Sequence, residues 1–164
     1  MDFNDIDNIR GVGFVGFKTF EEIVADRGIV PREKGVYLVI NPKRTADFLH
    51  IGNGGYFKGK NPNVPIDFLK SCWIDNTLVV YIGKAGSDRT RATLQSRLLQ
   101  YARFGHGENV CHYGGRYVWQ LSNFASLEVC WKPLPNNDPR AVEKELITAF
   151  KQHYGSRPFA NLQD

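Results

Sequence analysis

Four residues near the middle of the chain have types and a spacing suited to binding a phosphate. Tyr81 and Lys84 follow a short apolar run, and Arg97 and Tyr101 stand four positions apart. In a helix, residues four apart lie on the same face. Arginine and lysine both donate hydrogen bonds to phosphate oxygens, arginine through a planar fork. The stretch 77–104 therefore suits a phosphate grip, although on its own it is more typical of an ordinary strand–helix unit with a solvated basic face.

Two predicted elements position these side chains. Residues 78–82 form a short apolar run rich in β-branched side chains, which is typical of a buried strand. After a glycine-bounded turn, apolar residues recur at helical spacing, at Leu94, Leu98, Leu99 and Ala102. This stripe predicts a basic amphipathic helix over 93–104 with its apolar side toward the core.

Other strand signals are clearest at two places. GVYLVI at 35–40 and LEVCW at 127–131 predict strands, whereas RYVWQL at 116–121 is too short to distinguish a strand from a helix. Residues 11–16 spell G-x-G-x-x-G, the dinucleotide-binding fingerprint, but a polar segment precedes them where that fingerprint needs a strand. We expect a glycine-rich loop or turn there.

Capping residues mark two more helices. Thr19 and Glu22 form a capping-box pattern ahead of FEEIVADR, which predicts a short helix. Asp138 followed by Pro139 is a typical helix start, and Gly155 a typical end, so a long helix is expected between them.

Length and composition indicate one folded domain over residues 1–164. The chain has 164 residues and a mass of 18.6 kDa, with 42% hydrophobic and 13% aromatic residues, which is globular rather than disordered. The net charge of +4 and the pI of about 9.0 permit an acidic partner such as nucleic acid, although many basic proteins bind none.

The cysteines and the apolar runs indicate the compartment. Cys72, Cys111 and Cys130 are odd in number and far apart, so we expect reduced thiols. A zinc site made of Cys111, His106 and His112 fits no standard ligand spacing, and we expect none. No apolar run approaches a membrane span and the opening is acidic, so we expect a cytoplasmic protein with no membrane partner.

Residues 41–77 form a long segment rich in glycine, asparagine and proline, with an expected hairpin or helix near PIDFLKSCW. Such long loops in compact domains are usually functional or mobile. Two interpretations remain open: a solvated loop, or a basic flap in which Lys58 and Lys60 follow a nucleic-acid backbone.

Several familiar catalytic motifs are missing from the sequence. No D/E-x-K tripeptide occurs, which removes one common nuclease core, and the glycines at 83–86 lack the P-loop spacing. Neither H-E-x-x-H nor G-x-S-x-G is present, and the acidic residues are too scattered to suggest a two-metal centre.

Five blocks in order remain, namely GVY at 35–37, VYIGKA at 80–85, LQSRLLQY at 94–101, VEKELI at 142–147 and PFAN at 158–161. Together they resemble the GIY-YIG nuclease family. The resemblance implies an α+β fold in which a small, mainly antiparallel central β-sheet is flanked by α-helices. It places the expected catalytic residues at Tyr37, Tyr81, Arg97, Tyr101, Glu143 and Asn161.

The resemblance also implies a chemistry. DNA phosphodiester bonds would be hydrolysed with one Mg²⁺ or Mn²⁺ ion bound by Glu143, while Lys84 and Arg97 bind the phosphate. Tyr37 or Tyr81 would orient or deprotonate the water, with Tyr37 slightly favoured. Asn161 would fix the geometry of the site or contact a phosphate.

Further contacts to nucleic acid are expected from Lys58, Lys60, Arg89 and Arg91. We expect His106, His112 and His153 in loops or on a helix surface, with no catalytic part, and Trp73, Trp119 and Trp131 in the core.

Two departures from the family pattern affect the expected organisation. The GIY and YIG blocks are separated by 41–77, which we interpret as an insertion for target recognition, and residues 1–34 form an N-terminal extension. The turn before Arg97 is longer than usual, so Arg89, Arg91 and Arg103 compete weakly for its place.

The expected function is that of an endonuclease in restriction, defence or mobile-element processing. Two alternatives stay open, a non-cleaving binding module on the same fold and a nuclease acting on RNA or branched DNA. The oligomeric state is not predicted.

Overall fold

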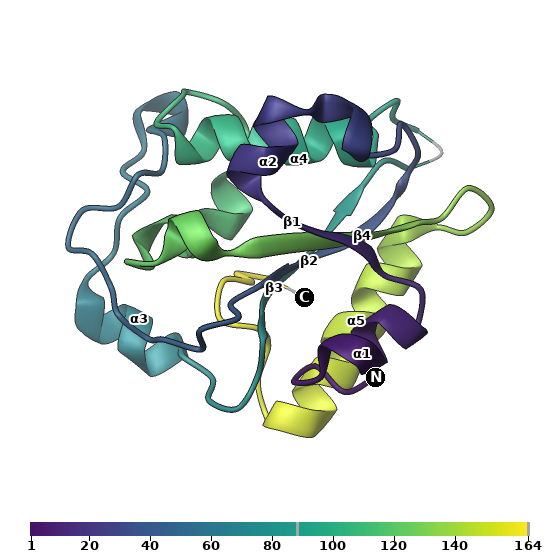
Figure 1. Ribbon diagram of the computed structural model, residues 1–164. Coiled ribbons are helices and arrows are strands. Elements are labelled where there is room, and N and C mark those ends of the chain that lie inside the picture. The colour runs from purple at the N-terminus through teal and green to yellow at the C-terminus, as the bar shows by residue number, and fades with distance from the viewer. Residues whose placement is uncertain (88, 164) are drawn as a thin grey trace.

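A four-stranded antiparallel sheet forms the centre of the computed structural model, which describes residues 1–87 and 89–163 (Figure 1). The strands are β1 (Val15–Thr19), β2 (Gly35–Ile40), β3 (Val79–Ala85) and β4 (Glu128–Pro133). Their order across the sheet is β1-β4-β2-β3, and every neighbouring pair is antiparallel. The expected α+β fold with an antiparallel sheet is confirmed.

Helices cover both faces of this sheet (Figure 1). They are α1 (Ile6–Gly11), α2 (Phe20–Ala25), α3 (Ile66–Cys72), α4 (Leu94–Gly105) and α5 (Pro139–Tyr154). Short 3-10 turns connect them, at η1 (Arg27–Ile29), η2 (Phe57–Gly59), η3 (Tyr113–Gln120) and η4 (Phe124–Ser126). The expected caps are present: Thr19 and Glu22 form a capping box at α2, and Asp138 caps α5.

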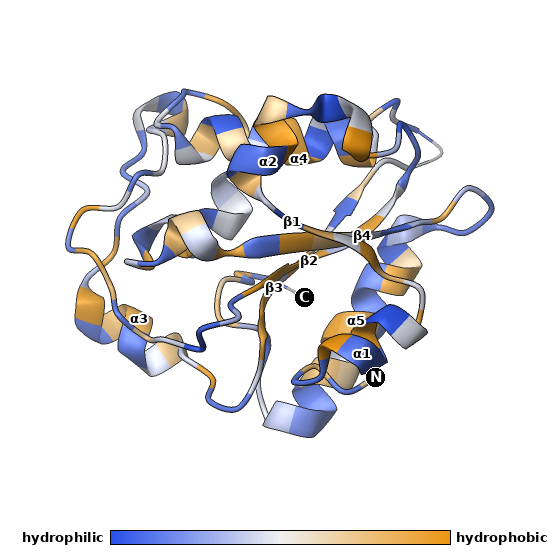
Figure 2. Ribbon diagram, in the orientation of Figure 1, coloured by the Kyte–Doolittle hydropathy of each residue, from blue (hydrophilic) through white to orange (hydrophobic). Residues whose placement is uncertain are grey.

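Alternation along β2 divides the core into two clusters. Val36, Leu38 and Ile40 face the cluster that contains α1 and α5, whereas Tyr37 and Val39 face the cluster under α2 and α4. All six residues of β2 are buried, as expected for an inner strand flanked on both edges and covered on both faces. Figure 2 shows the apolar character of β2 and the mixed character of the covering helices.

Strand β1 lies where the sequence predicts only a glycine-rich loop or turn. The G-x-G-x-x-G pattern runs from the end of α1 into β1, so a helix precedes a strand, the reverse of a dinucleotide-binding turn. Gly16 has φ +100, and a side chain there would overlap the Trp131 ring of β4. The glycine therefore serves close strand packing, which no local pattern reveals.

The insertion 41–77 is anchored to the rest of the molecule. Helix α3 fulfils the expectation near PIDFLKSCW, and its Leu69 is fully buried. The side chain of Gln120 donates to the carbonyls of Leu49 and Val64 and accepts from the Val64 N–H. The ambiguous segment 116–121 is mostly part of η3, not a strand.

Within the residues described, no helix combines the length and the apolar character that a bilayer crossing requires.

Candidate active site

A cavity of about 400 Å³ lies between β3, α5, η3 and the C-terminal segment. Its lining includes four residues that the sequence places in a site, Tyr81, Lys84, Glu143 and Asn161. They come from segments far apart in the sequence, and α5 reaches them because it packs against β3 and β2. The fold thus brings these four predicted residues to one place.

Lys84 and Glu143 form an ion pair on the cavity wall. The Lys84 Nζ atom lies 3.2 Å from Glu143 Oε2, and the two side chains are 34% and 21% exposed. Burial raises the pKa of the Glu143 carboxyl, and the neighbouring Lys84 ammonium partly offsets that rise. The carboxylate is therefore half-buried, paired and still reachable from the cavity.

The carboxylate fits a metal ion that retains most of its water. Among the described residues, no group of three or more His, Cys, Asp and Glu side chains lies close enough to enclose a cation. Mg²⁺ is often bound through one or two carboxylates, with the remaining positions filled by water and phosphate. Glu143, facing an open polar cavity, is a donor of that kind.

Arg97 lines a second cavity, of about 560 Å³, which shares Lys84 with the first. The Arg97 guanidinium donates to Gln100 Oε1 at 2.7 Å and to the Cys111 carbonyl at 3.1 Å. Arg89 and Arg140 line the same cavity, and Asp138 is its one acidic lining residue among those described. The second cavity is therefore strongly basic, and Lys84 lies where the two cavities meet.

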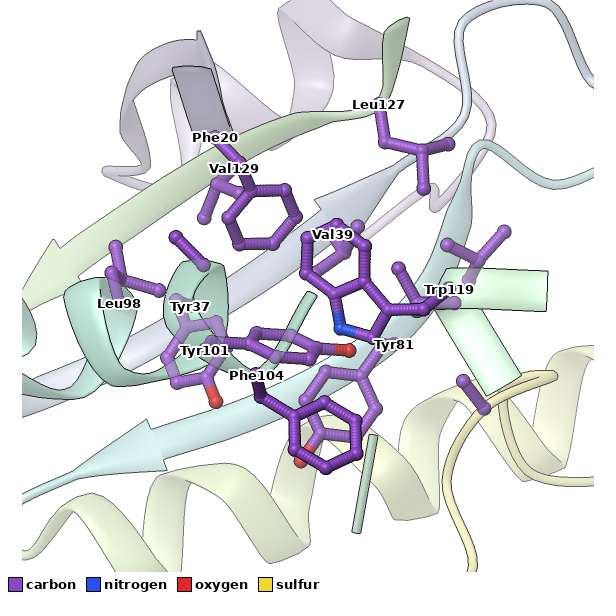
Figure 3. Close-up of a cluster of buried hydrophobic side chains, with 14 of the residues drawn as sticks. Phe20, Tyr37, Val39, Tyr81, Leu98, Tyr101, Phe104, Trp119, Leu127 and Val129 are labelled. Carbon is purple, nitrogen blue, oxygen red and sulfur yellow. The ribbon is translucent and has the colours of Figure 1, made fainter. Parts of the chain in front are cut away.

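The three predicted tyrosines gather between β2, β3 and α4 (Figure 3). The ring centroids of Tyr37 and Tyr81 are 6.0 Å apart, and those of Tyr81 and Tyr101 are 5.6 Å apart. Tyr37 and Tyr101 are fully buried, whereas Tyr81 is 8% exposed and lines the first cavity. Burial raises the pKa of all three phenols, and the charge of Arg97 lowers each of them in part.

Gly83, the glycine of the YIG block, lies too close to Tyr37 to carry a side chain. A side chain at Gly83 would overlap the Tyr37 ring, which lies across the ladder between β2 and β3. Tyr37 and Gly83 are direct partners in that ladder. The glycine in the YIG block therefore makes room for the tyrosine in the GVY block.

The Tyr101 hydroxyl forms its hydrogen bond within the core. The hydroxyl donates to the Gly115 carbonyl at 2.7 Å, and the ring stacks on His112 with centroids 3.7 Å apart and planes at 8°. This predicted catalytic residue thus lies in the core beside Tyr37 and Tyr81, without lining either cavity.

His112 is a site neighbour that the sequence analysis missed. We expected a histidine in a loop without a catalytic part, but His112 is 1% exposed, and its Nε2 atom lies 3.3 Å from the Tyr37 hydroxyl. The surrounding GHGENVCHYGG is polar and glycine-rich, so nothing local indicates burial. His106 and His153 are exposed, as expected.

Asn161 holds the edge of β3. Its Oδ1 accepts from the Ile82 N–H at 2.9 Å, and its Nδ2 donates to the Ile82 carbonyl at 2.8 Å. The neighbouring Ala160 N–H donates to the Val80 carbonyl. The amide therefore pairs with the backbone of the YIG block.

The remaining predicted contacts lie outside the first cavity. Lys58, Lys60 and Arg91 are exposed and line neither cavity. The insertion nevertheless reaches the first cavity wall, because the Tyr113 hydroxyl donates to the Asn61 carbonyl at 2.8 Å.

All three cysteines are free, as expected. Cys111 and His106 are exposed while His112 is buried, and no zinc-like cluster exists among the described residues.

Comparison with known proteins returns no matching family model, no matching curated protein and no matching solved structure.

Proposed function

We propose that this protein is an endonuclease of the GIY-YIG type that hydrolyses DNA phosphodiester bonds with one divalent metal ion. The observation that carries the proposal is that Tyr81, Lys84, Glu143 and Asn161 line one cavity, and that Arg97 lines the basic cavity beside it. These are the residue types that the sequence resemblance assigns to the reaction.

Each side chain has a role suited to its surroundings. Glu143 would hold Mg²⁺ or Mn²⁺, which supplies charge stabilisation for the leaving oxygen. Arg97 donates to a non-bridging phosphate oxygen, and Lys84 adds a positive charge between the two cavities. Asn161 keeps β3 in place through Ile82.

We assign contact with the attacking water to Tyr81 rather than to Tyr37. Tyr81 lines the cavity, whereas Tyr37 is fully buried and lines neither cavity. Burial raises the pKa of Tyr81, and the Tyr37 phenol, whose ring centroid lies 6.0 Å from that of Tyr81, acts in the opposite direction by favouring the phenolate. Tyr37 is thus a support for Tyr81 in this scheme.

One observation favours a second candidate, a binding module that does not cleave. The Lys84 ammonium already pairs with a Glu143 oxygen at 3.2 Å, and a permanent ion pair would keep a metal out. The basic second cavity would then bind a phosphate without hydrolysis.

A supercoiled-plasmid nicking assay with Mg²⁺ separates these candidates. We expect nicking by the wild-type protein, a loss of at least about 100-fold for Arg97→Ala, and little change for the exposed control Arg103→Ala on the same helix. Linear RNA and branched DNA are assayed in parallel. Tight binding without cleavage of any of these substrates would favour the binding module, and cleavage confined to RNA or branched DNA would correct the substrate.

A further inference from the structure

We propose that His112 is a positioning residue of this site. The His112 ring stacks on Tyr101, and its Nε2 atom holds the buried Tyr37 phenol. Tyr37, held in this way, supports Tyr81 at the cavity wall. The inference rests on the proposed hydrolysis. It extends that proposal by one residue for which the sequence carries no signal.

The imidazole is fixed on two sides. Its ring lies flat on Tyr101 of α4, with centroids 3.7 Å apart, and its edge reaches the Tyr37 hydroxyl of β2. Tyr101 is itself fixed by the hydrogen bond of its hydroxyl to the Gly115 carbonyl. The contact between His112 and Tyr37 therefore has little freedom to change, as a positioning role requires.

The imidazole is neutral, which makes its two nitrogens different. Burial and the charge of Arg97 hold the pKa of His112 well below its usual value. A neutral ring has one N–H donor and one acceptor nitrogen, and Nδ1 has no hydrogen-bond partner among the described residues. A buried N–H without an acceptor is rarer in proteins than an acceptor without a donor, so we place the proton on Nε2.

This tautomer sets the direction of the neighbouring hydrogen bond. With the proton on Nε2, His112 donates to the Tyr37 oxygen, and the Tyr37 hydroxyl proton is left to favour negative charge on Tyr81. The titratable groups that face His112, Tyr37 and Tyr81 are Arg97 and Tyr101 of α4, Glu143 of α5, and Lys84 of β3, which lines the cavity with Tyr81 and pairs with Glu143.

The alternative is that His112 only fills space. A phenylalanine at this position preserves the stacked ring and removes the nitrogen, so His112→Phe isolates the hydrogen bond. His153→Phe, on an exposed histidine of α5, is the matched control. Cleavage rates are measured against pH and substrate concentration, and folding is followed by thermal unfolding.

For His112→Phe we expect kcat to fall about tenfold with KM within about twofold of wild type, because the change acts through the base and not through phosphate binding. The rate–pH profile should move to higher pH, since the Tyr81 phenolate loses support. An unchanged kcat and pH profile in a folded His112→Phe variant would overturn the inference.

Nitrogen-15 NMR of the histidine rings gives a readout that does not depend on cleavage. We expect His112 as the neutral Nε2–H tautomer at pH 7, with its Nε2 signal displaced in Tyr37→Phe. An Nδ1–H tautomer, or a signal that ignores Tyr37→Phe, contradicts the inference even if His112→Phe fails to fold. Failure of the proposed function would show differently, as a wild-type protein that cleaves no nucleic acid.

Discussion

Glu143 is the residue on which the proposed chemistry depends most, and its surroundings let folding and chemistry be tested apart. Its carboxylate is half-buried and paired with Lys84 at the edge of a cavity. Ion pairs with this much exposure contribute at most about 1 kcal/mol to stability. Neutral variants of Glu143 should therefore fold, so that any loss of activity reports on the site.

Asn161 presents the opposite case, a residue whose contacts are structural. We expect Asn161→Ala to lower the free energy of unfolding by roughly 2–4 kcal/mol, because it leaves the buried Ile82 N–H and carbonyl without partners. Urea denaturation measures the change, with the exposed Asn137→Ala as control. A loss below about 0.5 kcal/mol would mean that the two hydrogen bonds do not hold β3.

The burial of His112 predicts a sensitivity of folding to acid. An unfolded histidine titrates near pH 6.5, whereas burial keeps the folded His112 neutral well below that value. Below pH 6.5 the unfolded chain therefore binds a proton that the folded chain does not, so this contribution to stability is complete above pH 6.5 and is lost as pH falls. The slope is at most about 1.4 kcal/mol per pH unit.

Unfolding free energies between pH 7 and pH 5 test this directly. The decline should be shallower in His112→Phe than in wild type, and unchanged in the exposed control His153→Phe. Parallel curves for wild type and His112→Phe would show that His112 gains a proton in the folded state as readily as in the unfolded state.

At the scale of elements, three consecutive residues connect the insertion to the site. The Cys111 carbonyl accepts from Arg97, the His112 ring contacts Tyr37, and the Tyr113 hydroxyl donates to the Asn61 carbonyl. A nucleic-acid segment bound by the insertion would therefore lie close to the groups assigned to phosphate binding and to contact with the attacking water. This arrangement suits an insertion that takes part in target binding.

A basic flap would add to the salt dependence of DNA binding. Neutralising Lys58 and Lys60 together should weaken binding and reduce the slope of log K against log salt by up to about 2, because each phosphate contact contributes about 0.9. Fluorescence anisotropy on a short duplex measures it. Arg10→Ala with Lys18→Ala, near the β1 edge of the sheet and away from β3, is the control. An unchanged slope would remove these two lysines from the interface.

Elements with a local signal were predictable from the sequence, and elements set by distant contacts were not. Thr19 with Glu22 and Asp138 with Pro139 mark helix starts through hydrogen bonds made within a few residues, and both helices are present. Strand β1 was not predicted because the need for a glycine at Gly16 comes from the Trp131 ring of another strand, which is distant in the sequence. Helix α4 was predictable from its stripe, but not that Tyr101 turns its hydroxyl to η3.

The residues of the candidate site differ in the same way: some carry a local signal in the sequence, and others depend on distant contacts. Tyr81, Lys84, Glu143 and Asn161 could be listed from ordered motifs, and they line one cavity. The burial of Tyr37 follows from its place on an inner strand of the sheet, which the short apolar run at 35–40 alone could not establish. His112 depends on long-range packing against β2 and α4, and its polar segment contains no trace of that packing.

At the scale of the whole molecule, the candidate site lies at the sheet, where the two hydrophobic clusters of the core meet. Strand β3 is an edge strand, and α5 with the C-terminal segment packs along it. One face of the sheet supplies Tyr81 with its buried tyrosine neighbours, while α5 brings Glu143 from the other. The polar cavity thus lies at the edge of the sheet, between the two hydrophobic clusters of the core.

The rate of supercoiled-plasmid nicking as a function of Mg²⁺ concentration tests the central claim most directly. The wild-type protein should nick DNA only with the metal and saturate as it is added, whereas Glu143→Gln should lose at least about 100-fold in rate while remaining folded. Glu145→Gln, an exposed glutamate on the same helix, should retain the wild-type rate. Nicking by Glu143→Gln at the wild-type rate, or a metal-independent rate for the wild type, would contradict the account.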